Sequence, residues 1–367
     1  MDRRLAIFLA TSGHSGVDKV MGNFIRELAS RGQAVDLIRI RGHGPYLAEE
    51  LPNVRPITLP TSHVNSALFP LVRYLRMERP EVLLSDKDRV NRVALLARRI
   101  SGVNTRIVIR VGTTVSLNLA RRGFIHRHLQ YLSIKHLYPW SDCIILPSKG
   151  AAQDLERIAP HLSKKIKVTP SPVASPELEL LSRQVPVHPW LTDRQEPIIL
   201  GVGELCGRKN FSCLIRAFAL VNNKVPSRLI ILGEGRQRAH LQHLAGELGI
   251  ADRISLPGFV SNPYAFMARA SVFVLSSLCE GAPVVLMEAL ALGIPVVSTD
   301  CPSGPAEILE GGKIAPLVPI GDPATMAQAI LSVLDKPPDP ELLRSASMPF
   351  TVKKATDCYL QTIGLLS

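Results

Sequence analysis

Short apolar runs alternate with longer segments of mixed polarity along the whole chain. Each run has the length of a strand buried on both faces, and several intervening segments show helical spacing, the first from Val17 to Arg31. This alternation is typical of parallel sheets joined by crossover helices, so we predict an α/β fold. The predicted strands are residues 4–10, 34–40, 81–85, 106–111 and 143–148 in the first half, and 197–203, 228–235, 253–259, 272–277 and 295–299 in the second.

The alternation is interrupted by a segment rich in proline and polar residues at 173–196, which we interpret as a linker. A chain of 367 residues is long enough for two domains, each with its own core. We therefore predict two Rossmann-like doubly wound domains, over residues 1–172 and 173–348. Residues 349–367 follow a proline-rich break and are predicted to form a final helix.

The most informative segment for chemistry runs from Glu280 to Glu288. It lies between an apolar strand and an apolar helix, so its turn is expected at a helix N-terminus, where unpaired amides can bind phosphate. Two acids beside an anion site are suited to accept hydrogen bonds from the hydroxyls of a sugar. The pattern therefore predicts a sugar-nucleotide site whose turn is Gly281, Ala282, Pro283 and Val284, with Pro283 in the first helical turn.

Composition is that of a globular protein, with 46% hydrophobic and 20% charged residues. The apolar run after the first arginines is short for a signal peptide and is better interpreted as a strand. The longest apolar stretch, 281–299, contains Glu288 and two prolines, which argues against a membrane span. Six scattered cysteines show no metal-binding or disulfide spacing. We expect a reduced, cytoplasmic protein, with the inner face of the membrane as a peripheral site.

Positive charge is concentrated in the first half of the chain. Residues 1–172 contain 27 Lys and Arg against 13 Asp and Glu, whereas the whole chain has a net charge of +12. An ordinary solvated basic surface and a surface that rests on anionic lipid both explain this excess. Nucleic acid is a weaker alternative, because aromatic residues are few and no nucleic-acid motif is present.

One basic segment, residues 121–140, carries two alternatives of its own. It contains Arg121, Arg122, Arg127 and Lys135, and its apolar residues Ile125, Leu129 and Leu132 share one helical face. That face either packs on the sheet of its own domain, as a crossover helix does, or belongs to an interfacial helix that holds a lipid-linked acceptor near the membrane.

The second half resembles the donor-binding domain of glycosyltransferase family four. The similarity lies in ILGVGELCGRKNFSCLIRAF, in RLIILGEGRQRAHL and in the long segment from RISLPGF to PAEIL, which contains the two glutamates separated by seven residues. The first half is a looser match, through TSGHSGVDKVMGNF and SDCIILPSKG. The resemblance implies a retaining enzyme of GT-B fold, with two Rossmann-like domains facing across a cleft and the final helix crossing back to the N-terminal domain.

The resemblance also implies residue roles. Glu280 is expected to contact the hydroxyls of the donor sugar, and Glu288 the ribose hydroxyls. Lys209 and Arg208 are expected to balance the charge of the departing diphosphate, which Gly16 lets backbone amides approach from the other domain. The nucleotide base is expected near Val260. No divalent metal is implied, since no Asp-x-Asp site appears in a suitable loop.

Two positions depart from the family pattern. Glu204 stands where relatives commonly have a phosphate-binding arginine, and Arg208 is the candidate replacement. Gly112 stands near the place of a histidine that faces the reacting sugar in many relatives, so a backbone carbonyl or Thr113 is expected to serve instead. These departures leave open a related protein that binds nucleotide sugar or glycan without turnover.

We therefore predict a hexosyltransferase that moves sugar from a nucleotide diphosphate to a glycan or lipid-linked glycan in polysaccharide or lipopolysaccharide assembly. A sugar-nucleotide epimerase with the same two-domain shape is a second rival. A nicotinamide cofactor is disfavoured, because Gly201 and Gly203 do not complete a G-x-G-x-x-G fingerprint.

Overall fold

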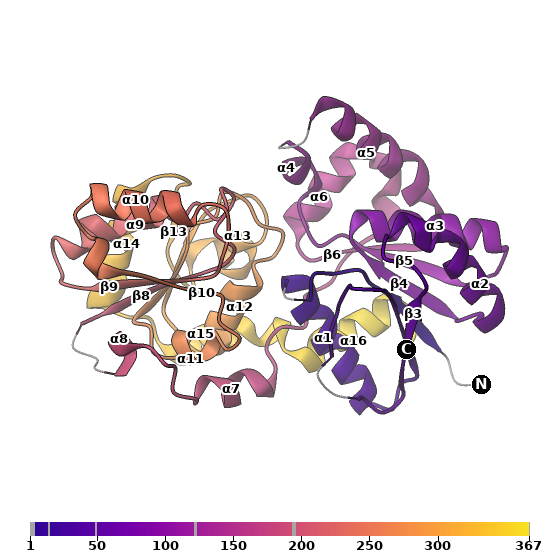
Figure 1. Ribbon diagram of the computed structural model, residues 1–367, viewed down its shortest axis with the longest axis horizontal. Coiled ribbons are helices and arrows are strands. Elements are labelled where there is room, and N and C mark those ends of the chain that lie inside the picture. Colours follow the sequence, from indigo (N-terminus) through magenta and orange to yellow (C-terminus); the bar gives the residue numbers. More distant parts are fainter. Residues whose placement is uncertain (1–3, 14, 48–49, 121–122, 193–195, 367) are drawn as a thin grey trace. The chain divides into compact units, whose positions relative to one another are not determined.

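The computed structural model describes residues 4–13, 15–47, 50–120, 123–192 and 196–366 (Figure 1). The chain forms two compact units, each described by itself below. The first unit comprises residues 1–173 together with 350–367, and the second comprises 174–349. Each contains a parallel sheet with its own apolar core, so the predicted α/β fold with two doubly wound sheets is confirmed.

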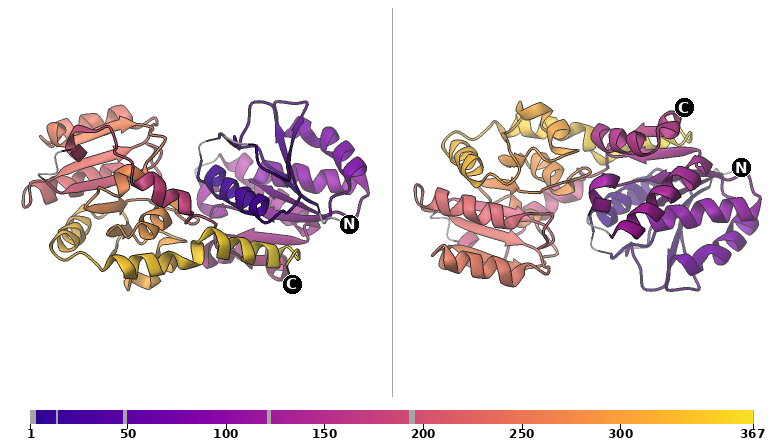
Figure 2. Two further views of the ribbon diagram at one scale, coloured as in Figure 1. Left: turned by 90° about the horizontal axis from the view of Figure 1, so that it is seen from below. Right: turned by 90° about the horizontal axis from the view of Figure 1, so that it is seen from above.

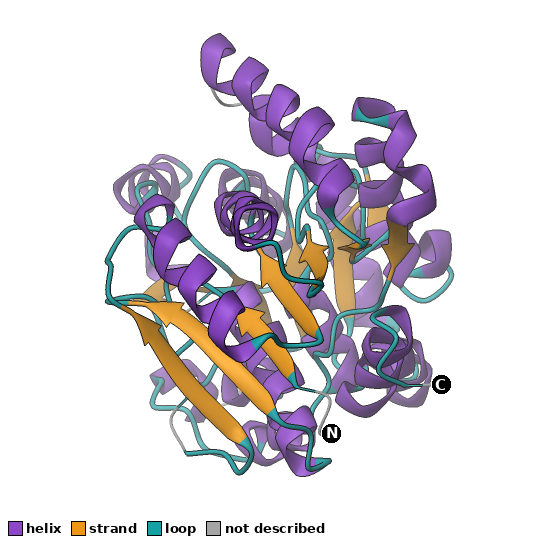
Figure 3. Cartoon of the chain, turned by 90° about the vertical axis from the view of Figure 1, so that its right-hand side faces the viewer, coloured by secondary structure: helices purple, strands orange, loops and turns teal. Residues whose placement is uncertain are grey.

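The first unit has a seven-stranded sheet in the order β3-β2-β1-β4-β5-β6-β7, with helices on both faces (Figure 3). All five strands predicted here are confirmed. Its strands are β1 (Leu5–Phe8), β2 (Val35–Ile40), β3 (Val54–Leu59), β4 (Val82–Asp86), β5 (Arg106–Arg110), β6 (Cys143–Leu146) and β7 (Ile166–Val168). Its helices are α1 (Gly16–Ser30), α2 (Leu68–Glu78), α3 (Asp88–Ser101), α4 (Val115–Ala120), α5 (Phe124–Leu137), α6 (Lys149–Ile158) and α16 (Val352–Thr362).

The two strands that the sequence did not predict in this unit, β3 and β7, are the edges of the sheet. Strand β3 contains Pro56 and exposes several of its residues, and β7 is only three residues long. Proline and partial exposure are tolerated at an edge, where one side of the strand needs no ladder partner. Edge strands therefore lack the apolar run that marks the central ones.

The second unit has a six-stranded sheet in the order β10-β9-β8-β11-β12-β13. Its five predicted strands are confirmed, and the unpredicted β13 is a two-residue edge. The strands are β8 (Ile198–Val202), β9 (Arg228–Leu232), β10 (Ile254–Gly258), β11 (Val272–Leu275), β12 (Val296–Thr299) and β13 (Leu317–Val318). The helices are α7 (Pro176–Ser182), α8 (Pro189–Thr192), α9 (Phe211–Asn222), α10 (Arg238–Glu247), α11 (Tyr264–Met267), α12 (Val284–Ala291), α13 (Pro305–Ile308), α14 (Pro323–Asp335) and α15 (Pro340–Ser347).

The segment expected to be a linker, 173–196, instead contains two short helices, α7 and α8. Helix α7 packs on α11, and the Asn262 side-chain amide donates to the carbonyl of Leu181. Both helices begin at a proline, which is favoured in the first helical turn. They are too short to show the apolar periodicity by which a longer helix is predicted. Most of this segment thus belongs to the body of the second unit.

The final helix, α16, packs against α1 in the first unit (Figures 1 and 2). The ring of Tyr359 lies 5.0 Å from that of Phe24, and Arg31 forms an ion pair with Asp357. The chain therefore enters the second unit after residue 173 and returns at residue 350, where the backbone N–H of Val173 donates to the carbonyl of Phe350.

Helix α5 corrects one of the two interpretations of segment 121–140. Ile125, Leu129 and Leu132 do not pack on the sheet: their side chains are 74%, 60% and 39% exposed. The helix is held by its other face, where Ile134 is buried. The helix does connect β5 to β6 and packs on the core of its own unit, but not through the face of Ile125, Leu129 and Leu132. Arg121 and Arg122 lie outside the described residues.

Candidate functional site

The candidate site of the second unit lies at the carboxyl ends of β8 and β11. These neighbouring strands end level with each other, since Leu200 pairs with Phe273 and each strand ends two residues later. The chain leaves β8 toward β9 on one side, while β11 begins the other half of the sheet. In open α/β sheets, ligands bind outside the carboxyl ends at this topological switch point.

Two loops at this point bring together three of the predicted residues. The loop after β8 contributes Arg208 and Lys209, and the loop after β11 contributes Glu280. Lys209 Nζ lies 2.8 Å from Glu280 Oε1, and an Arg208 guanidinium nitrogen lies 2.9 Å from Oε2. Lys209 and Glu280 are each only 9% exposed, whereas the side chain of Arg208 reaches solvent.

Hydroxyl and backbone groups fix these loops to each other. Ser277 Oγ donates to Glu280 Oε1 at 2.7 Å, and Ser276 Oγ donates to the carbonyl of Lys209 at 2.8 Å. The N–H of Leu278 donates to the carbonyl of Arg208. Thr299, at the end of β12, supports the turn by donating to the carbonyl of Ser277. The acid and the two cations are thus held in place by groups from three adjacent strands.

Gly203 makes room for the lysine. A Cβ atom built at Gly203 would lie 2.9 Å from Lys209 Cε and 3.2 Å from its Cδ. The aliphatic stem of Lys209 therefore crosses the backbone at the end of β8, where any side chain would push it away from Glu280. This close approach gives a physical reason for glycine at the position.

Electrostatics keep the carboxylate of Glu280 charged. Burial by itself would raise the pKa of the Glu280 carboxyl, but the charges of Lys209 and Arg208 outweigh burial and hold that pKa below its usual value. The carboxylate in turn raises the pKa of the Arg208 guanidinium, against the lowering effect of burial. Burial and the nearby Glu280 raise the pKa of the Cys301 thiol to about 12, so this thiol stays neutral.

Helix α12 begins at Val284, where the apolar helix was predicted, but the place of Pro283 differs from the prediction. Pro283 is its N-cap, with φ −70° and ψ 103°, and does not occupy the first helical turn. Its carbonyl accepts from the N–H groups of Leu286 and Met287. The backbone N–H groups of Val284 and Val285 precede this first turn of bonds, as expected of donors at a helix N-terminus. Gly281 and Pro283 are buried in the preceding turn, and Ala282 is partly exposed.

Glu288 lies in the second turn of α12 and is almost completely buried. Its Oε1 accepts a hydrogen bond of 2.8 Å from the hydroxyl of Tyr264, at the start of α11. A hydroxyl ligand of Glu288 would therefore share the carboxylate with Tyr264. Val260 is partly buried and follows the end of β10, at the same carboxyl edge of the sheet.

Gly16 belongs to the first unit, whereas Glu280, Lys209 and Arg208 belong to the second. It is the first residue of α1, after the N-cap Ser15, and Asp18 completes a capping box with Ser15. The loop that it ends follows β1, which stands at the switch point of the first sheet between β2 and β4. Gly16 thus occupies a position in its unit that is equivalent to that of the loop after β8.

The structure gives a physical account of both departures from the family pattern. Glu204 is exposed, while Arg208, four residues later, points its guanidinium at Glu280. Gly112 adjoins the guanidinium of Arg110, and a Cβ atom at Gly112 would lie 2.9 Å from one of its nitrogens. Arg110 is itself buried and bonded to Asp86, Tyr359 and Ser171, so a side chain at position 112 would displace a fixed group.

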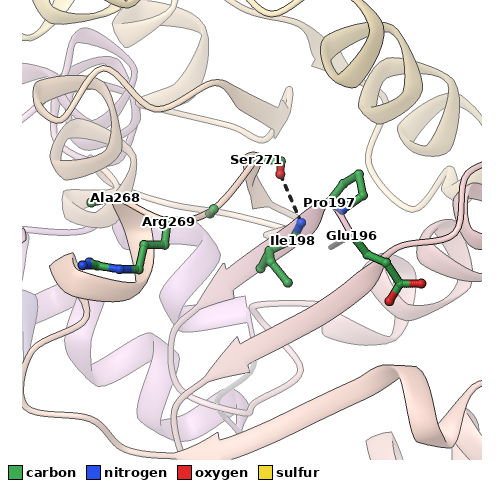
Figure 4. Close-up of a pocket in the computed structure, with 7 residues that line it drawn as sticks. Glu196, Pro197, Ile198, Ala268, Arg269 and Ser271 are labelled. Atoms are coloured by element: carbon green, nitrogen blue, oxygen red, sulfur yellow. Dashed lines mark hydrogen bonds between the residues drawn. The ribbon is translucent and has the colours of Figure 1, made fainter. Parts of the chain in front are cut away.

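A shallow pocket elsewhere in the second unit takes no part in this arrangement (Figure 4). It is lined by Glu196, Pro197 and Ile198 before and at the start of β8, and by residues 268–271 before β11. It therefore lies at the amino ends of the same strands, opposite the edge that carries Glu280. Its acid, Glu196, is paired with Arg228 and Arg253.

Comparison with known proteins follows the same division of the chain. A family model described as "Glycosyltransferase Family 4" matches residues 14–175, and one described as "Glycosyl transferases group 1" matches residues 196–336. The chain is 30% identical over 348 residues to the N-acetylgalactosamine-N,N'-diacetylbacillosaminyl-diphospho-undecaprenol 4-alpha-N-acetylgalactosaminyltransferase of Campylobacter jejuni, with 91% of this chain and 90% of the relative covered. The chain belongs to glycosyltransferase family four. It is a transferase of the hexosyltransferase type, as predicted.

A second relative of this glycosyltransferase is the lipopolysaccharide core biosynthesis glycosyltransferase LpsE of Rhizobium meliloti, 26% identical over 87% of this chain and 85% of the relative. Among solved structures, Anabaena Alr3699/HepE in complex with UDP-glucose has a TM-score of 0.79 at 16% identity, covering 99% of this chain and 100% of that one. The apo form of the lipopolysaccharide outer core galactosyltransferase WaaB has a TM-score of 0.75 at 19% identity, covering 98% and 99%. The fold of the glycosyltransferase is GT-B.

Sequence reasoning did not single out Ser277, Tyr264 or Thr299 as parts of the site. Ser277 and Thr299 follow or end apolar strands, and a hydroxyl at the carboxyl end of a central strand is the signal that identifies them. Tyr264 carries no comparable signal, because its contact with Glu288 depends on how α11 packs beside α12.

Proposed function

We propose that this glycosyltransferase moves a hexose from a nucleotide diphosphate sugar to a glycan or lipid-linked glycan, with retention of anomeric configuration, in polysaccharide or lipopolysaccharide assembly. The observation that carries the proposal is the buried carboxylate of Glu280, held by Lys209 and Arg208 at the switch point of the second sheet. A sugar hydroxyl needs a hydrogen-bond acceptor and a diphosphate needs cations. This cluster supplies both within one small space.

The chemistry asked of these groups is charge stabilisation. As the bond from the anomeric carbon to the diphosphate oxygen breaks, negative charge grows on the leaving group. Lys209, Arg208 and the N–H groups that begin α12 supply fixed positive charge and dipoles for it. The leaving diphosphate accepts the proton of the incoming acceptor hydroxyl on the same face of the sugar, so the new bond retains configuration. We propose that these groups balance the charge without a metal ion.

The acids have separate roles in the proposal. Glu280 accepts hydrogen bonds from the donor sugar, while its ion pairs orient both cations. Glu288, positioned by Tyr264, accepts from the ribose hydroxyls. The turn Gly281, Ala282, Pro283 and Val284 and the segment at Val260 complete the nucleotide site in the second unit.

The acceptor proposal is supported by the names of relatives. The Campylobacter relative is named for a diphospho-undecaprenol acceptor, and LpsE for lipopolysaccharide core biosynthesis. A lipid-linked acceptor places the reaction at a membrane surface, so we propose a cytoplasmic protein that associates with the inner face through its basic first half. Among the described residues, no helix is both long and apolar enough to cross a bilayer.

The test is transfer or donor hydrolysis measured across UDP-, GDP- and ADP-sugars. With the nucleotide sugar that proves active, Glu280→Ala and Lys209→Ala should each lower kcat/KM by at least about a hundredfold, since each substitution removes a group at the developing charge. Glu247→Ala and Lys224→Ala, at exposed positions of the same unit, are the matched controls and should retain activity.

Two results would count against the proposal. Equal activity in the Glu280 variant and its control would remove the assigned site. Donor binding without any turnover by the unaltered protein would instead favour the alternative of a glycosyltransferase-like binding protein, which Glu204 and Gly112 keep open.

A further inference from the structure

We infer that the exposed face of α5 inserts into an anionic lipid surface. Four large apolar side chains project from this helix into solvent, and Phe124 and Ile125 are each 74% exposed. Leu129 and Leu132 continue the exposed row along the next two turns, with 60% and 39% exposure. Contiguous apolar exposure of this kind marks a surface that contacts another apolar phase.

The helix is fixed so that this face cannot turn inward. Ile134 is buried in the core of the first unit, and Tyr131 and Leu137 pack against the same core. These positions recur every three residues and lie on the side of α5 away from Leu129. Rotating the helix to bury Leu129 would therefore expose Ile134, so the apolar row needs an external partner to leave water.

Charge selects anionic lipid as that partner. Residues 121–140 contain no aspartate or glutamate, and Lys135 is exposed on the same helix. The guanidinium of Arg127 lies 5.9 Å from the centre of the Phe124 ring, next to the apolar row. Arg89 and Arg99, both exposed, lie on α3, against which α5 packs. Each Lys or Arg near an anionic leaflet contributes about 1 kcal/mol of attraction.

A second copy of this chain fits the face less well. A symmetric contact would place the α5 face against itself, because both partners use the same surface in a two-fold dimer. Basic side chains would then face basic side chains without an acid from the same segment to pair with. With 14 residues, α5 is about 21 Å long, which suits a helix that lies within the headgroup region.

This inference deepens the membrane association in the proposed function, but its test needs no sugar transfer. The unaltered protein is floated with vesicles of equal parts phosphatidylglycerol and phosphatidylcholine, and with phosphatidylcholine vesicles alone. We expect binding to the anionic vesicles only, weakened by high salt. The variant Ile125→Gln, Leu129→Gln, Leu132→Gln should lower the partition coefficient at least about tenfold, because it removes the inserted apolar area.

The matched control replaces three leucines that are comparably exposed on helices of the second unit: Leu180→Gln, Leu220→Gln and Leu342→Gln. It should bind vesicles as the unaltered protein does. Equal flotation of the α5 variant and the control would overturn the inference, as would no flotation of the unaltered protein. A dimer in solution that the α5 variant converts to a monomer, without vesicle binding, would assign the face to a second copy and overturn it too.

Two further readouts separate failure of this inference from failure of the proposed function. A thermal shift of the α5 variant with nucleotide sugars, equal to that of the unaltered protein, shows that the variant is folded and keeps its donor site. Loss of vesicle binding with donor binding retained assigns α5 to the membrane alone. Loss of both marks a folding defect, in which case the single substitution Leu129→Gln replaces the triple variant in the flotation.

Discussion

At the scale of single residues, the site depends on a carboxylate that is nearly buried and still charged. Removing one partner of a buried pair leaves an uncompensated charge, which costs far more than the pair itself contributes. Glu280 balances two cations, so its loss affects both. The arrangement therefore couples the stability of the second unit to the protonation of one side chain.

The pH dependence of stability follows from this coupling. The pKa of the Glu280 carboxyl is lowered on folding, so its contribution is fully present above the ordinary value near 4.5 and is lost as pH falls through the lowered value. Glu280→Gln should therefore destabilise the second unit by about 3 kcal/mol at pH 7 and by clearly less near pH 3. Calorimetric unfolding of both proteins from pH 3 to 7 measures this. A difference that does not shrink in acid would contradict the assigned charge state.

At the scale of elements, α16 is joined to the first sheet by a buried polar cluster. The Arg110 guanidinium, at the end of β5, donates to Asp86 at 2.6 Å, to the Tyr359 hydroxyl at 2.9 Å and to Ser171 Oγ at 3.2 Å. Burial alone would lower the pKa of Arg110, but Tyr359 and Asp86 raise it. Arg110 therefore ties residues from β4, β5 and the last helix into one group.

Substitution of Asp86 and substitution of Tyr359, two partners of Arg110, should lower the stability of the first unit by different amounts. Asp86→Asn removes the only charge that Arg110 contacts in these bonds and should destabilise the first unit by about 3 to 5 kcal/mol. Tyr359→Phe removes one neutral hydrogen bond and should cost about 1 kcal/mol. Urea unfolding followed by hydrogen exchange of α16 compares them. Equal costs for the two variants would show that the charge pair is not what holds α16.

At the scale of the whole molecule, each unit has loops at the carboxyl edge of a parallel sheet, and the proposed nucleotide site is in the second unit. A ligand that binds only the folded protein raises its apparent stability by mass action. The nucleotide base is the property of the donor that such a measurement identifies directly.

A thermal-shift series with UDP, GDP and ADP should therefore single out one nucleotide. At about a hundredfold excess over its Kd, that nucleotide should stabilise the folded state by about 2.7 kcal/mol. In Lys209→Ala the shift should fall, because the diphosphate loses a cation, while exposed Lys224→Ala should leave it unchanged. A shift that is identical in the unaltered protein and in Lys209→Ala would place the diphosphate elsewhere.

The sequence by itself determined the elements and the local chemistry. Strands buried in a parallel sheet are apolar runs, so the nine central strands, and the edge strand β10 as well, could be located without coordinates. The turn from Glu280 to Pro283 could also be predicted, because the strand before it, its glycine and proline, and the helix after it are contiguous in the sequence. Edge strands β3, β7 and β13 and the short helices α7 and α8 were missed, since little burial or length constrains their residues.

Only the tertiary structure decided which of these residues meet. Glu280 and Lys209 are 71 positions apart, and the order of strands in the second sheet brings them together. Arg110 and Tyr359 are 249 apart, and they meet because α16 packs on the first unit. The exposed face of α5 was equally undetermined, because helical spacing shows that three side chains share a face and not whether that face meets the core. Periodicity is a property of neighbours along the chain, whereas contact and exposure depend on where the rest of the chain lies.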